Sequence, residues 1–134
     1  MKNLFAIAVL CAGLGAIPAS AHHSLAAYTL SSYRTIDGTV KSFDWTNPHA
    51  KLTLSVVDAG GHIVNWQFEG GSIGRLTSGG FKRDVVMSGD KIKVAYNPRR
   101  DNGIGGFFIA VTTESGMTYS VDRYKQINED AAKH

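Results

Sequence analysis

The sequence has 134 residues, of which 43% are hydrophobic and 19% are charged, with 14 basic and 11 acidic side chains. This length suits one small domain rather than two, and the composition excludes wholesale disorder. The formal net charge is +3 and the basic residues are scattered along the chain. Nothing in the charge distribution therefore favours nucleic acid as a partner.

Residues 1–21 have the three parts of a secretory signal peptide. Lys2 supplies the positive charge, and an apolar run follows from Leu4 to Leu14. This run is shorter than the roughly 20 residues that cross a membrane, and Ala19-Ser20-Ala21 is a small-x-small cleavage site. An uncleaved anchor helix is the alternative. We expect cleavage after Ala21, export to the periplasm and no membrane span in the mature protein.

The mature chain is expected to contain no disulfide. Cys11 is the only cysteine and would be removed with the signal peptide. Hydrophobic burial must then stabilise the domain without covalent help. We divide the mature chain into a lead-in at 22–34, a folded domain at 35–127 and a polar, flexible tail at 128–134.

Period-two patterns predict most of the secondary structure. Apolar and polar residues alternate strictly in 51–56, 64–69 and 91–96. This pattern is typical of strands with one buried face and one exposed face. A hairpin turn at Asp58-Ala59-Gly60-Gly61 joins the first two of these strands.

Further strands are expected before and after this central set. In 35–45 the alternation changes phase, which a β-bulge near Lys41 and Ser42 would explain. Residues 107–112 and 117–121 form a last strand pair, and Met87 and Met117 are interpreted as packing residues.

The segment between the third and fourth strands, 70–80, predicts a short helix. Ser72 would cap its start and Gly79 would end it. The order of elements predicts an all-β domain, a small five- to six-stranded OB-like barrel with one short helix between strands 3 and 4. A small β-sandwich is the alternative.

Two histidines would form the new N-terminus after cleavage. The α-amino nitrogen and the ring Nδ1 of His22 can chelate one metal ion together. The amine titrates near pH 8 and the ring near pH 6.5, so both are available to a metal ion near neutral pH. Cu(II) prefers such nitrogen ligands and binds them more tightly than other divalent first-row ions do. His23 or His49 would supply a third nitrogen. The alternative is that His22 and His23 simply follow a cleavage site.

His49 lies in the segment Trp45-Thr46-Asn47-Pro48-His49, which predicts a turn between the first two strands. It is either a metal ligand that this turn positions or a strand-end residue that makes a local hydrogen bond, and the second interpretation is favoured. Glu69, at the end of the third strand, either faces a pocket or lies on an exposed strand face. His62, in the Gly60-Gly61 hairpin, is interpreted as an exposed loop residue.

The loop from Pro98 to Gly106 is rich in glycine and carries Arg99 and Arg100. Loops in this position often border the binding face of OB folds, and two arginines can hold an anion. A solvated hairpin tip is the alternative. No Ser/His/Asp set, carboxylate pair or Cys/His cluster has the spacing of a catalytic site, so an enzyme is the least favoured class.

Several segments resemble a bacterial secreted family catalogued as domain of unknown function 6152. The resemblance rests on Ala21-His22-His23-Ser24, Gly38-Thr39-Val40, Trp45-Thr46-Asn47-Pro48-His49, Asn65 to Ser72 and Gly89-Asp90-Lys91. It implies a periplasmic location and a single β-rich domain, and it implies no ligand. The stretch Ile73-Gly74-Arg75-Leu76 departs from the family pattern.

We therefore expect a small exported periplasmic binding protein that holds a divalent metal, copper above all, through His22 with His49 or His23. Its partner would be a metal-handling or envelope protein. The alternative is an OB-like module that binds a small molecule, a glycan or a protein partner without metal, through Arg99, Arg100 and the aromatic strand faces.

Overall fold

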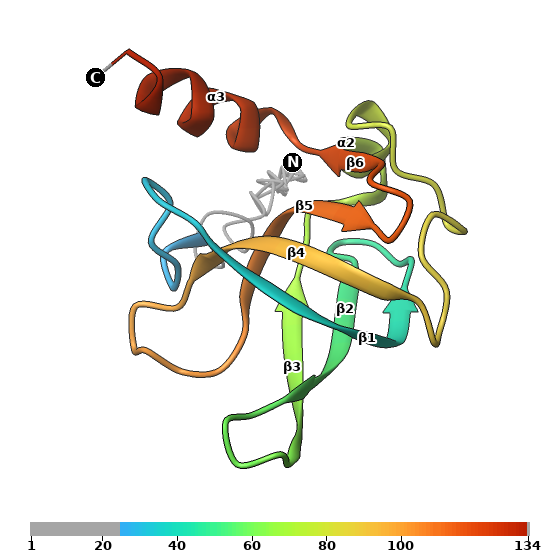
Figure 1. Ribbon diagram of the computed structural model, residues 1–134. Helices are drawn as coiled ribbons and strands as arrows, with labels where there is room; N and C mark the ends of the chain where they lie inside the picture. The colour runs from blue at the N-terminus through green and yellow to red at the C-terminus, as the bar shows by residue number, and fades with distance from the viewer. Residues whose placement is uncertain (1–24, 134) are drawn as a thin grey trace, which may run out of the picture.

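The computed structural model describes residues 25–133. These residues fold into one sheet of six strands with helices at its end (Figure 1). The elements are β1 (Arg34–Asp44), β2 (Lys51–Val57), β3 (Ile63–Glu69), α2 (Ile73–Ser78), β4 (Lys91–Pro98), β5 (Gly106–Thr113), β6 (Thr118–Ser120) and α3 (Asp122–Ala131). The predicted β-rich class and the short helix between the third and fourth strands are confirmed.

The strands pair in the order β3-β2-β1-β4-β5-β6, and a further parallel pairing joins β3 to β5. This pairing connects Phe68 with Gly106 and Glu69 with Phe107. The first five strands therefore form a closed ring of pairings, β1-β2-β3-β5-β4. The ring brings the end of β3 next to the start of β5, and the candidate site lies at this junction.

The predicted bulge in β1 is confirmed. The register between β1 and β2 shifts between Val40 and Ser42, which leaves Lys41 as the extra residue. The bulge restores the phase of the alternation, so that Val40 and Phe43 both pack inward against the core. It also bends β1, which lets this one strand pair with both β2 and β4.

The core fills the interior of the ring. Leu52 and Leu54 from β2, Val94 from β4 and Phe108 from β5 are completely or almost completely buried. Phe108 also contacts Phe81, from the connection between α2 and β4, with ring centroids 6.1 Å apart. This apolar contact holds the connection against the sheet.

Helix α2 begins and ends as its sequence predicts. The Ser72 hydroxyl accepts a hydrogen bond from the backbone N–H of Arg75, and Gly79 is the C-cap. Leu76 is completely buried and anchors the helix on the core. The short helix therefore fixes the path of the chain immediately after β3.

Two expectations about packing and the C-terminus are wrong. Met87 and Met117 are 60% and 58% exposed, because they lie in turns beyond the core rather than within it. Residues 128–131, expected in a flexible tail, belong to helix α3. Tyr124 and Ile127 of α3 pack on the edge of the core, and tertiary packing of this kind stabilises a helix whose sequence is mostly polar.

Among residues 25–133, no helix is long and apolar enough to cross a membrane. The expected signal peptide, residues 1–21, lies outside the described part of the chain.

Candidate functional site

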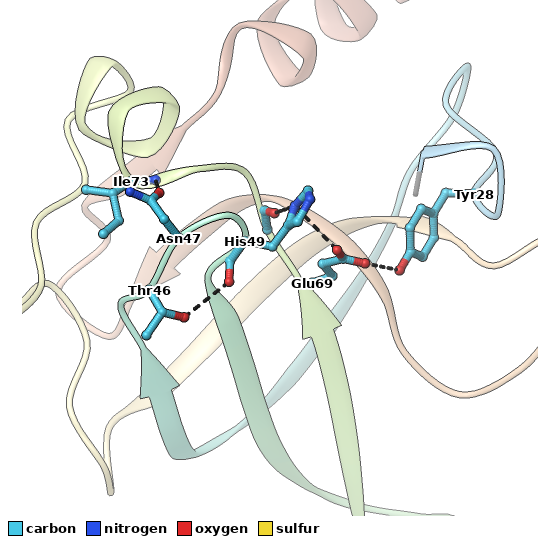
Figure 2. A network of polar contacts seen from close by, with 7 residues as sticks. Tyr28, Thr46, Asn47, His49, Glu69 and Ile73 are labelled. Atoms are coloured by element: carbon cyan, nitrogen blue, oxygen red, sulfur yellow. Dashed lines mark hydrogen bonds and ion pairs between the residues drawn. The ribbon is translucent and has the colours of Figure 1, made fainter. Parts of the chain in front are cut away.

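The loop between β1 and β2 carries His49 and is fixed by contacts to two other parts of the fold (Figure 2). The Asn47 side-chain oxygen accepts a hydrogen bond of 3.0 Å from the backbone N–H of Ile73, the first residue of α2. The Thr46 hydroxyl donates to the His49 carbonyl at 3.3 Å. Ala50, directly after His49, is completely buried. The His49 backbone is therefore held from both sides.

The His49 ring is oriented through its Nδ1 atom. Nδ1 lies 3.0 Å from the Gly70 carbonyl oxygen and 3.3 Å from the Glu69 carboxylate oxygen Oε1. A carbonyl can only accept, so Nδ1 carries the hydrogen. In the neutral imidazole this leaves a lone pair on Nε2, and no residue within 25–133 makes a hydrogen bond to Nε2.

Glu69 joins His49 to the N-terminal segment. Its second carboxylate oxygen, Oε2, accepts a hydrogen bond of 2.9 Å from the Tyr28 hydroxyl (Figure 2). Burial of the hydroxyl, the hydrogen bond to Glu69 and the charge of Glu69, in that order, raise the pKa of Tyr28 to about 12. Tyr28 therefore stays protonated as a donor and holds the carboxylate in place.

Gly70 and Gly71, the residues that follow β3, connect these contacts to the start of the described chain. A Cβ atom at Gly70 would overlap the ring of Phe108, so only glycine allows this close approach. Gly71 lines a small cavity together with Leu25, the first described residue. Leu25 therefore borders the same space as the residue that follows Gly70, whose carbonyl contacts the His49 ring.

A groove of about 490 Å³ lies on the strand side of the network. Tyr28, Glu69, Lys51 and Gln67 are among the residues that line it. Arg99 borders it from the loop between β4 and β5. The groove carries charges of both signs and is open to solvent.

The two arginines of the β4–β5 loop already have partners. Arg99 makes two hydrogen bonds to the Asp101 carboxylate, which lower the pKa of that carboxyl to about 2. The Arg100 Nε donates to the Tyr28 carbonyl at 3.1 Å. Arg99 therefore borders the groove with its guanidinium occupied, and Arg100 fastens the segment around Tyr28 to the loop.

The other predicted metal ligands, His22 and His23, lie outside the described residues. Within 25–133, no three His, Cys, Asp or Glu side chains gather as they would around a metal ion. His62 is exposed at the tip of the β2–β3 hairpin, as expected, and pairs with Asp58 at 3.4 Å. Among the described histidines, only His49 has a ring held against both a carbonyl and a carboxylate.

Sequence reasoning considered His49 and Glu69 separately and missed their contact. It also assigned no role to Tyr28. The alternation of apolar and polar residues in 64–69 did indicate that Glu69 points away from the core, and its side chain remains 29% exposed. The missing information was that the segment around Tyr28 pairs with Arg99, which brings the Tyr28 hydroxyl to Glu69, and no local pattern records this.

A family model described as a family of unknown function (DUF6152) matches residues 8–108. The chain belongs to this family. Membership confirms the resemblance drawn from the Trp45 to His49 and Asn65 to Ser72 segments. No curated protein and no solved structure matches the chain. The family description assigns no activity, so function is argued from the site.

Proposed function

We propose that this chain is a small exported protein that binds one divalent metal ion, with Cu(II) as the best-suited ion. His22 would contribute its α-amino nitrogen and ring Nδ1, and His49 would contribute Nε2. His23 is the alternative source of the third nitrogen. Imidazole and amine nitrogens in a tetragonal arrangement suit Cu(II).

The observation that carries the proposal is the orientation of His49. Histidines that bind metals almost always donate their other ring N–H to a carbonyl or a carboxylate, which fixes the tautomer and the ring direction. His49 has both acceptors, Gly70 O at 3.0 Å and Glu69 Oε1 at 3.3 Å. The Nε2 lone pair is then the free position for a metal.

The path of the chain also supports the proposal. His22 is three positions before Leu25, and an extended chain spans at most about 3.5 Å per residue, so a covalent path of at most roughly 11 Å connects the two residues. Leu25 and Gly71 line one cavity, and the neighbouring Gly70 carbonyl holds the His49 ring. This chain length is compatible with His22 and His49 binding the same ion.

Export is part of the same proposal, because the amine of His22 is free only after cleavage behind Ala21. The chelate would form in the periplasm, and the protein would hand copper to, or receive it from, a metal-handling or envelope protein. Removal of His22 and His23 would therefore remove the chelate.

The test compares two purified forms, one starting at His22 and one starting at Ser24, which lacks both terminal histidines, by Cu(II) calorimetry and electron paramagnetic resonance. The His22 form should bind at least about tenfold more tightly and show nitrogen couplings from amine and imidazole. His49→Ala should lose one nitrogen coupling, whereas His62→Ala, a change in an exposed histidine, should have no effect. Equal affinity and equal spectra of the two forms would contradict the proposal.

We further infer that the closed ring of strands is an OB-type barrel. The parallel β3–β5 pairing and the helix between β3 and β4 support this inference. In such barrels the β1–β2 and β4–β5 loops border the binding face. The 490 Å³ groove beside Arg99 therefore favours a second candidate function, which is binding of a small molecule, a glycan or a protein partner without metal.

This second function predicts that changing both Arg99 and Arg100 to Ala weakens capture of the partner. A pull-down from periplasmic extract that recovers the same protein with and without the two changes would contradict it.

A further inference from the structure

Arg123, in the first turn of α3, has an unusual environment. Its Nη1 atom is buried and has no hydrogen-bond partner among residues 25–133. A buried donor without an acceptor is costly, and a charged donor is more costly than a neutral one. An acceptor that belongs to a ligand would remove this cost.

A second arginine faces the same cavity. Arg75 of α2 and Arg123 both line a space of about 30 Å³, whose other walls include Gly71 and the apolar side chains of Leu25, Phe107 and Val121. No carboxylate lines this space, and neither arginine forms an ion pair within the described part of the chain.

The two guanidinium groups affect one another. Burial first, and then the positive charge of Arg75, lower the pKa of Arg123. The fold therefore brings two like charges to one partly apolar space without a compensating negative charge. A bound anion would supply that charge and the missing hydrogen-bond acceptor together.

We propose that Arg75 and Arg123 form a binding site for the carboxylate group of a small organic acid. A volume of 30 Å³ has room for about two oxygen-sized atoms, which matches a carboxylate better than a phosphate. Guanidinium groups bind carboxylates through paired hydrogen bonds. The apolar walls strengthen these bonds because they exclude water.

A single water molecule is the competing occupant. Water could accept a hydrogen bond from Arg123 Nη1, but it would leave both positive charges uncompensated. The two occupants therefore differ in charge, and a titration with an anion distinguishes them.

The test uses purified metal-free protein in a chloride buffer from which the chelator has been removed, so that its result is independent of any metal site. Sodium acetate is added at constant ionic strength while the side-chain N–H signals of arginine are followed by nuclear magnetic resonance. The Arg123 signal should shift and saturate, and phosphate should produce a weaker shift. The proposal would be overturned if the chemical shifts changed linearly with acetate concentration, without saturation, and equally for all arginines.

Variants identify the residues responsible. Arg75→Gln and Arg123→Gln should each weaken acetate binding about tenfold. Arg83→Gln removes an exposed arginine that lies outside the cavity and should leave binding unchanged. Because Arg75 is exposed, its variant should keep the circular dichroism spectrum of the native protein. Unchanged acetate affinity in a folded Arg75→Gln protein would overturn the proposal.

Discussion

At the scale of single residues, the Glu69 carboxylate makes the most consequential contacts. One of its oxygens lies near His49 Nδ1 and the other accepts from the Tyr28 hydroxyl. Tyr28 is almost fully buried, which places a phenol beside a carboxylate and away from water. The carboxylate thereby fixes a histidine on one side and keeps a tyrosine protonated on the other.

The contact with Glu69 and the burial of Tyr28 predict that its phenol ionises at an unusually high pH. The pKa of Tyr28 in the folded protein is about 12, against 10.0 in an unconstrained tyrosine. The folded state holds the proton more tightly, so this stabilisation is complete below pH 10 and is lost as the pH rises through 12. The absorbance of the native protein and of Tyr28→Phe is measured as the pH rises. The difference between the two titration curves should show one phenol that ionises near pH 12.

Glu69→Gln provides the control for this prediction. It removes the charge and keeps the size of the side chain, so the pKa of Tyr28 should fall but remain above 10, because burial is the largest cause of its rise. A Tyr28 phenol that ionises near pH 10 in the native protein would contradict the structure.

At the scale of elements, the β4–β5 loop closes the ring. Gly105 has φ +96°, and a Cβ atom there would overlap the Gln67 carbonyl oxygen of β3. The next residue, Gly106, pairs with Phe68. The chain can approach β3 closely enough for this pairing only because Gly105 has no side chain.

Two glycine substitutions separate backbone strain from steric overlap. Gly116 also has a positive φ, +86°, but nothing lies within 4 Å of a Cβ atom built there. Gly116→Ala should lower the free energy of unfolding by roughly 1 kcal/mol. Gly105→Ala should lower the free energy of unfolding by at least about 2 kcal/mol more than Gly116→Ala does, because the added Cβ atom would overlap backbone atoms. Urea unfolding measures both, and equal losses would show that the close approach to Gln67 is absent.

At the scale of the whole molecule, hydrophobic burial is the main source of stability in a described chain without cysteine. Phe108 is completely buried at the centre of the aromatic packing, with ring centroids 6.3 Å from Phe43 and 6.1 Å from Phe81. It therefore joins the bent β1 strand to the connection between α2 and β4. Removal of this side chain affects both contacts.

Phe108→Ala should lower the free energy of unfolding by about 3–5 kcal/mol. Small domains have a total stability of about 5–15 kcal/mol, so this variant should be close to unfolded at 37 °C. Ile104→Ala changes a side chain that is 58% exposed and should cost less than about 0.5 kcal/mol. Thermal unfolding of both variants tests the contrast, and similar melting temperatures would contradict the assigned core.

The sequence by itself determined the elements that depend on neighbouring residues. Alternation in 51–56 and 64–69 predicted β2 and β3, a change of phase near Lys41 predicted the bulge, and Ser72 with Gly79 predicted the ends of α2. These signals are local, because strand faces repeat every two residues and helix caps act within one turn.

Tertiary structure decided how Tyr28 joins the site. His49 and Gly70, 21 residues apart, meet because β2 and β3 pair with Lys51 opposite Glu69, and the predicted hairpin implies this register. Tyr28 and Glu69 are 41 residues apart, and Tyr28 reaches the carboxylate from a segment that pairs with Arg99. Helix α3 was missed because packing on the core, rather than its polar sequence, stabilises it. Contacts between distant segments depend on which strands pair, and no periodicity within a single segment encodes that choice.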